Sequence, residues 1–273
     1  MEPDRNTASV ADRVRENQLW YHTMDLGGVV TNGWFDLRPI VDRLPWPDVK
    51  GKRCLDVGTY DGFLAFELER RGAAEVVCTD VPSHADWDHL PREREQALKF
   101  WAEEGGQKGL GFEIAKDVLG SQVTREWINI YDLSPERIGT FDVVVCGSLL
   151  LHLRSPFHAL AALRSVCTSE FLSCEQIDPR LTVVSRGRPA LFVEGTAGRW
   201  MVPNSSAHVH MLTMAGFDVD VDRHLRYAVP FGTGHPKRSH RSARELLRDA
   251  RMKLVTGEFE GVPHSAALAR VAI

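Results

Sequence analysis

The most constraining feature of this 273-residue chain is a glycine-containing turn between a buried strand and a helix. Residues 53–58 form a short apolar run, and residues 63–72 follow with helical spacing and end at a glycine. The linking residues 56–62, DVGTYDG, contain Gly58 and Gly62. Glycine is needed where the backbone turns sharply and approaches a ligand without a Cβ in the way. The sequence therefore predicts an α/β ligand-binding unit at this turn.

Apolar runs and helical segments alternate as far as about residue 180. Strands are expected at 53–58, 74–80, 127–133, 141–153 and 170–178, and helices at 63–72, 92–104, 111–120 and 158–167. Because these strands are apolar throughout, they predict a parallel sheet with helices on both faces. Residues 217–229 alternate like a half-exposed antiparallel strand, and the tail 263–273 has the pattern of a closing strand. We expect an α/β fold with a mostly parallel sheet of about seven strands.

Prolines at positions 39, 45 and 47 interrupt the chain before the first expected strand. We therefore expect residues 1–48 to form a helical lid segment and residues 49–273 to form the ligand-binding domain. After about residue 179 the alternation weakens, and arginines, prolines and histidines lie among short segments. This change predicts additions to the sheet that shape a second part of the site.

The composition excludes several classes of protein. The net charge of −4 argues against a general nucleic-acid binder, which is usually strongly basic. The five cysteines form no Cys-x-x-Cys pair and lie mostly in or beside apolar runs, which favours reduced, buried thiols. Neither a signal-peptide core nor an apolar run of the ~18 residues needed to span a membrane is found in the sequence. We expect a soluble, cytoplasmic protein that does not bind membranes, and the sequence does not indicate its oligomeric state.

A second acidic residue, Asp80, ends the next expected strand about 20 residues after Gly58, as in nucleotide-binding α/β folds where a carboxylate accepts the ribose hydroxyls. A dinucleotide site requires a glycine where this chain has Tyr60, which is too bulky for a close pyrophosphate. No Lys-Ser/Thr pair follows the turn, so a phosphate-binding P-loop is also excluded. S-adenosylmethionine is the remaining common adenosine ligand with a ribose and no phosphate.

The chain resembles the Rossmann-like S-adenosylmethionine-dependent methyltransferases in residues 55–62, 76–80, 127–133 and 141–153. Residues 20–37, WYHTMDLGGVVTNGWFDL, and 152–166, HLRSPFHALAALRSV, are similar to the family of the bacterial tRNA wobble-uridine carboxymethyltransferase and its methyltransferase relatives. The resemblance implies a cofactor pocket lined by Trp34, Gly58, Asp80, Val81, Ile130, Tyr131 and Gly147. Asp56, Thr59 and Gly62 complete this predicted set from the glycine turn.

Two positions depart from the pattern of the tRNA enzyme. Leu151 replaces a tyrosine, and Ala197 stands where an arginine is expected. Since those side chains recognise a carboxylated cofactor, their loss predicts plain S-adenosylmethionine and methyl transfer. It also makes tRNA a less favoured substrate.

Candidate catalytic groups follow the last parallel strands, where open α/β sheets bind ligands. His152 comes after the fourth strand and Glu175 lies in the fifth, so either could accept a proton from a hydroxyl acceptor. Acceptor contacts are predicted for Arg199, Trp200, Asn204, His210, Tyr227 and His235. The pair His208 and His210 lacks a spaced carboxylate or cysteine pair, and no metal site is expected.

The sequence therefore predicts a methyltransferase acting on a small molecule, most simply at a hydroxyl oxygen. Two alternatives stay open at this point. One is modification of the tRNA wobble uridine. The other is a cofactor-binding partner subunit without catalytic activity.

Overall fold

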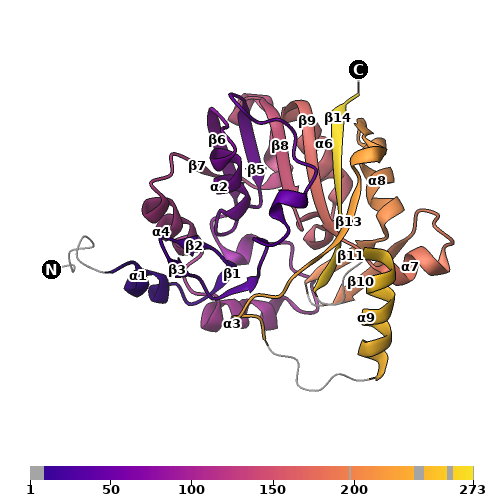
Figure 1. Cartoon of the computed structure of the whole chain (residues 1–273), viewed down its shortest axis with the longest axis horizontal. Coiled ribbons are helices and arrows are strands. Elements are labelled where there is room, and N and C mark those ends of the chain that lie inside the picture. The colour runs from indigo at the N-terminus through magenta and orange to yellow at the C-terminus, as the bar shows by residue number, and fades with distance from the viewer. Residues whose placement is uncertain (1–8, 197, 237–242, 257–260, 273) are drawn as a thin grey trace.

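A single large sheet forms the centre of the protein in this computed structural model, which describes residues 9–196, 198–236, 243–256 and 261–272 (Figure 1). Its strands are β5 (Arg53–Val57), β6 (Glu75–Asp80), β7 (Thr124–Trp127), β8 (Phe141–Gly147), β9 (Cys167–Gln176), β12 (Phe217–Val219), β13 (Leu225–Val229) and β14 (Val262–Val271). The strand order is β12–β14–β9–β8–β5–β6–β7, and β13 also pairs with β14. The strands from β7 to β9 are parallel, whereas β14 runs antiparallel to β9, β12 and β13.

Helices cover both faces of this sheet, as the sequence predicts. The principal ones are α2 (Phe63–Arg70), α4 (Leu110–Leu119), α6 (Pro156–Val166) and α8 (Ser205–Met214). Cys54 and Val143 share one core with α2 and α4, while Leu55 and Val144 share the opposite core with α6 and α8. Because neighbouring residues of a strand point to opposite faces, a strand between two cores must be apolar at every position.

The third strand lies earlier in the chain than predicted. Strand β7 ends at Trp127, and the predicted strand 127–133 instead contains a 3₁₀ turn, η3 (Ile130–Asp132). The Asn129 side chain accepts the backbone N–H of Tyr131 at 3.1 Å, which starts this turn. Ile130 is buried in the core all the same, so its hydrophobicity does not mark a strand.

Two other predicted strands are shorter than expected. Strand β8 stops at Gly147 because Ser148 takes a positive φ of 51°, and a second 3₁₀ turn, η4 (Leu150–His152), follows. The predicted strand 217–229 is divided into β12 and β13 by η5 (Val221–Arg223). The side chain of Asp220 accepts the backbone N–H of Asp222 at 3.1 Å and turns the chain there. Both halves still pair with β14, so together they occupy the seventh position of the sheet.

The N-terminal segment lies at the carboxyl ends of the parallel strands, beside α4 (Figure 1). It contains α1 (Val10–Glu16), β1 (Trp20–His22), β2 (Asp25–Leu26), β3 (Val29–Val30), β4 (Gly33–Phe35) and η1 (Val41–Arg43). Between β6 and β8 lie η2 (His84–Asp86), α3 (Arg94–Glu104) and α5 (Pro135–Ile138). The N-terminal segment contributes one wall of the candidate site.

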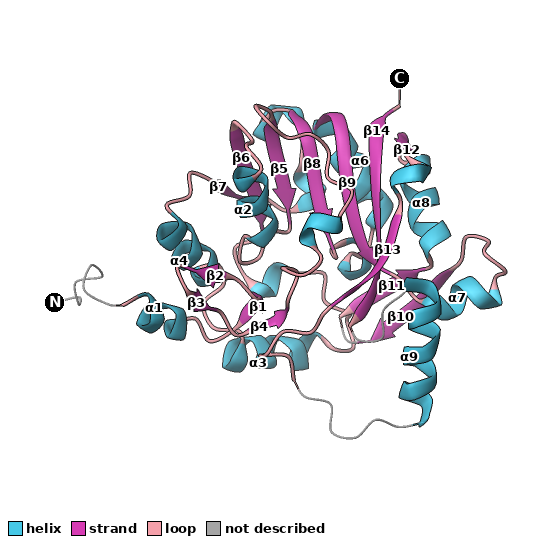
Figure 2. Cartoon of the chain, viewed as in Figure 1, coloured by secondary structure: helices cyan, strands magenta, loops and turns pink. Residues whose placement is uncertain are grey.

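The additions expected after residue 179 are α7 (Pro179–Val184), the hairpin β10 (Leu191–Thr196) and β11 (Arg199–Pro203), and α9 (Ala243–Thr256). Helix α9 packs against α7 and β13 (Figure 2). Among the described residues, no helix combines the length and the apolar character needed to cross a membrane.

Candidate active site

The glycine turn is fixed to the neighbouring strand by its own backbone. The N–H groups of Gly58 and Thr59 both donate to the carbonyl of Thr79, at 2.9 and 3.1 Å. Gly58 has a φ of +78°, and Gly62 has a φ of +92° immediately before α2. A Cβ on Gly62 would lie 2.5 Å from the ring of Phe66. Both glycines are therefore required for the turn that brings β5 into α2.

Asp80 presents its carboxylate beside this turn, at the carboxyl end of β6. It is 9% exposed and accepts the backbone N–H groups of Tyr60 at 2.9 Å and Val81 at 2.7 Å. A third donor is Lys108, whose Nζ lies 2.8 Å from Oδ2 of Asp80. Lys108 is not among the residues predicted from the sequence, although it lies in a glycine-rich stretch, Gly105-Gly-Gln-Lys-Gly109, that indicates an unusual loop.

Aromatic rings surround the Asp80–Lys108 pair. Tyr60 lies 6.2 Å from Trp87, and Trp87 lies 4.8 Å from Trp101, measured between ring centroids. Trp34 lies 6.2 Å from Trp101, so the structure brings this predicted cofactor residue to the same side of the sheet. A cavity of about 530 Å³ is lined by Trp101, Lys108, Trp127 and the loop after Val81. Its volume lies within the range of small-molecule sites.

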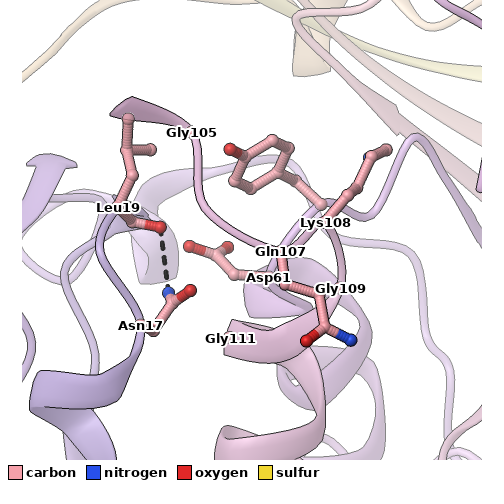
Figure 3. A pocket seen from close by; sticks show the side chains of 9 residues that line it. Asn17, Leu19, Asp61, Gly105, Gln107, Lys108, Gly109 and Gly111 are labelled. Carbon is pink, nitrogen blue, oxygen red and sulfur yellow. Dashed lines mark hydrogen bonds between the residues drawn. The ribbon is translucent and has the colours of Figure 1, made fainter. Parts of the chain in front are cut away.

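Asp61 connects the glycine turn to the N-terminal segment. It is 1% exposed, and its Oδ2 accepts the backbone N–H groups of Tyr21 at 2.9 Å and His22 at 2.8 Å. A second pocket of only about 10 Å³ lies between Asp61, Asn17 and the loop that contains Lys108 (Figure 3). The carboxylate therefore holds the N-terminal segment directly over the turn, a role not expected from the sequence.

Two buried carboxyl groups at the strand ends each have an oxygen atom without a hydrogen-bond partner among the described residues. Asp56 is 2% exposed with Oδ2 unpartnered, and burial raises its pKa to about 6. Glu175 is 1% exposed, and its Oε1 accepts the N–H groups of Leu149 and Leu150, both at 3.0 Å. Its Oε2 is unpartnered, and burial raises its pKa to about 7.

His152 is held in a defined orientation. Its Nδ1 donates to the carbonyl of Gly198 at 2.8 Å, which leaves Nε2 with the lone pair of the neutral ring. Burial lowers its pKa, and the nearby charge of Arg199 acts in the same direction. A neutral imidazole with a free Nε2 can accept a proton.

Tyr131 and Trp200 meet at a single residue of the loop after β6. The hydroxyl of Tyr131 donates to the carboxylate of Asp88, and Nε1 of Trp200 donates to the Asp88 carbonyl at 2.7 Å. These contacts fix the loop to the β10–β11 hairpin. Ile130 packs in the core, and a Cβ on Gly147 would lie 2.8 Å from the Leu64 side chain.

Two of the predicted acceptor residues belong to α8. Asn204 is completely buried and caps α8: its Oδ1 accepts from Ala207 and Ala190, and its Nδ2 donates to Ser185 and Arg188. The polar groups of Asn204 are thus used within the protein in this structure, and its role as an acceptor contact stays a prediction. His210 is exposed on α8, and nothing in the structure directs it toward the strand ends.

Arg199 lies in β11, and two further acceptor candidates, Tyr227 and His235, lie in β13 and in the loop that follows it. Tyr227 is buried in β13, with its ring 5.6 Å from that of His264. The ring centroids of His235 and Phe35 lie 5.5 Å apart. His235 lies near the end of a loop, 230–236, that runs along β4. In that loop the N–H of Gly232 donates to the carbonyl of Trp34 at 2.8 Å. Ala197, the other position noted from the sequence, lies outside the described residues.

Comparison with known proteins shows the fold. No family model and no curated protein sequence matches the chain. Among solved structures it is similar to the N-terminal domain of EvdMO1, determined in the presence of SAH and D-fucose, with 16% identity, a TM-score of 0.55, and coverage of 96% of this chain and 95% of that one. The chain has the Rossmann-like methyltransferase fold.

Two solved methyltransferase structures show weaker likenesses to the chain. The 1,6-didemethyltoxoflavin-N1-methyltransferase of Burkholderia thailandensis is 14% identical, with a TM-score of 0.49 and coverage of 87% of this chain and 78% of that one. A methyltransferase from Mesorhizobium loti is 13% identical, with a TM-score of 0.44 and coverage of 82% and 93%.

Proposed function

We propose that the protein is an S-adenosylmethionine-dependent methyltransferase. The observation that carries the proposal is the placement of Asp80, a buried carboxylate at the end of β6 that faces the Gly58 turn. Such a carboxylate can accept the hydroxyls of a ribose, and Tyr60 prevents the close backbone approach that a pyrophosphate needs. Trp34 and the rings around the 530 Å³ cavity supply aromatic surface for an adenine. When bound, the cofactor would supply an electrophilic methyl group.

We propose a small molecule with a hydroxyl group as the methyl acceptor. His152 supports this choice, because a neutral imidazole fixed through Nδ1 can take the hydroxyl proton at Nε2. The unpartnered Oε2 of Glu175 would orient the same hydroxyl or the imidazole. Leu151, only 1% exposed, offers no polar group to a carboxylated cofactor, and burying that carboxylate without donors would be unfavourable. The N-terminal segment and the loop 230–236 would form the lid over this site.

Calorimetric titration with S-adenosylmethionine tests the proposal. Replacing Asp80 by Ala removes charge-assisted hydrogen bonds worth roughly 1.5–3 kcal/mol, so we expect the affinity to fall about 10- to 150-fold. The matched control is Asp86→Ala, which removes an exposed carboxylate of the same loop region and should leave binding unchanged. Absence of binding by the wild-type protein, or equal binding by Asp80→Ala, would reject the proposal.

A further inference from the structure

Lys108 reaches Asp80 from outside the sheet. Its side chain is only 4% exposed, and its Nζ lies 2.8 Å from Asp80 Oδ2. The ammonium is also 4.9 Å from the ring centre of Tyr60 and 5.3 Å from that of Trp87, within the range of cation–π attraction. A lysine from the loop between α3 and α4 thus pairs with the carboxylate that the proposed function assigns to ribose.

Hydrogen-bonding capacity shows why this contact matters. A carboxylate offers about four lone-pair positions. Three donors already use them: the N–H groups of Tyr60 and Val81, and the ammonium of Lys108. A ribose presents two hydroxyl donors, so one existing donor must leave. The two N–H groups belong to the turn and to the strand end, whereas the lysine is held only by a loop.

The loop that carries Lys108 is rich in glycine. Gly105, Gly106 and Gly109 flank Lys108, and the last two have φ values of +62° and +87°. Glycine lowers the conformational barrier to rearrangement because it accepts both signs of φ. Burial lowers the pKa of Lys108 and the Asp80 carboxylate raises it, so the loss of hydration of the ammonium offsets part of its attraction to Asp80.

The two cavities meet at this side chain. Lys108 and Gln107 line the 10 Å³ pocket beside Asp61 (Figure 3), and they also line the 530 Å³ cavity beside Trp101. Movement of Lys108 would therefore connect the larger cavity with Tyr60 and the glycine turn. The result would be one continuous space along the cofactor-binding edge of the sheet.

We propose that Lys108 competes with the cofactor for Asp80, and that the loop 105–109 must carry Lys108 away before the ribose can bind. The inference rests on the proposed function. It makes Lys108 a determinant of cofactor affinity: apparent affinity equals intrinsic affinity multiplied by the fraction of molecules with the loop open. Removing the ammonium should therefore tighten binding.

Titration of S-adenosylhomocysteine into the wild type, Lys108→Met and Lys108→Gln tests this inference. If about one molecule in ten has the loop open, both variants bind about 10-fold more tightly. Methionine keeps the length of the side chain, and glutamine keeps a polar end, so a fold defect in one does not decide the result. Lys99→Met is the matched control, because Lys99 is 76% exposed on α3 and should not affect binding.

Two further arms separate competition from other roles. In an Asp80→Asn background, Lys108→Met should no longer tighten binding, because the ammonium has lost its carboxylate. In the wild type, S-adenosylhomocysteine should increase the rate at which Lys108 is acylated, measured by mass spectrometry.

Unchanged or weaker binding by both Lys108 variants, with a wild type that binds, overturns the inference and leaves the proposed function standing. Slower acylation of Lys108 on ligand binding overturns it as well. Failure of the wild type and of every variant to bind rejects both proposals.

Discussion

At the scale of single residues, the site contains buried polar atoms that have no hydrogen-bond partner among the described residues. An unsatisfied buried polar group costs about 1–3 kcal/mol, so such atoms are rare and call for an explanation. Asp56 Oδ2 and Glu175 Oε2 are two of them, at the carboxyl ends of β5 and β9. A ligand with hydrogen-bond donors would satisfy both, which is consistent with the placement of the proposed site.

His152 gives the first prediction at this scale. Because Nδ1 donates to Gly198, nitrogen NMR of the wild type should show a neutral ring protonated at Nδ1 near pH 7. His152→Ala should lower turnover with the true acceptor about 100- to 10,000-fold, the usual contribution of a general base. The affinity of His152→Ala for the cofactor should stay within a few-fold of the wild-type affinity. Near wild-type turnover in both His152→Ala and Glu175→Ala would show that neither residue is the base.

At the scale of elements, the proposed lid depends on a contact between two distant segments. The loop 230–236 runs along β4, and a Cβ on Gly232 would lie 2.2 Å from the carbonyl oxygen of Gly33. Gly232→Ala should therefore detach the loop and lower the free energy of unfolding by about 1–3 kcal/mol. Amide hydrogen exchange of Gly232 and Gly234 should become faster. Thr233→Ala, which removes only an exposed hydroxyl bond to Asn32, is the control.

The elements also show how far the sequence alone can lead. Apolar runs predicted β5, β6 and β9 because both faces of each of these strands are covered. The spacing from the glycine turn indicated Asp80 as a candidate. The third strand was predicted over the wrong residues because Ile130 is apolar. An apolar residue can be buried in the core without lying in a strand, as Ile130 is in its 3₁₀ turn. Lys108 could not be foreseen as a partner of Asp80, since the contact depends on how the α3–α4 loop folds back. Local patterns predict elements, whereas contacts between distant loops need the tertiary structure.

At the scale of the whole molecule, a buried histidine–serine network joins α8 to the central sheet. His208 is fully buried, with Nε2 2.9 Å from Ser173 Oγ and Nδ1 2.9 Å from Ser265 Oγ. His224 lies 2.7 Å from the same Ser265 oxygen. These bonds connect β9, β14 and α8 on the side of the sheet opposite the glycine turn's helix. Protonating His208 would place a positive charge in the core. The hydrogen bonds of this network involve only histidine and serine, so they supply no carboxylate to balance that charge.

The network predicts acid sensitivity of the fold. Burial lowers the pKa of His208 to about 3, against an ordinary value of 6.5, so the unfolded chain binds more protons between these values. The stabilising contribution of His208 therefore falls as the pH drops below 6.5, by roughly 1.4 kcal/mol at one pH unit below. Asp56 and Glu175 act in the opposite direction, because their raised pKa values make their contributions fall as the pH rises.

A comparison of variants isolates the histidine from these opposing groups. Urea unfolding at pH 7.5 and 5.5 should show that the wild type loses about 1.4 kcal/mol more than His208→Gln, which has no ring to protonate. His210→Gln, on the exposed face of the same helix, should follow the wild type, because His210 takes no part in the hydrogen bonds that hold His208. Parallel pH profiles for the wild type and His208→Gln would contradict the prediction. In that case the network would tolerate protonation, and the acid response of the fold would have to arise elsewhere.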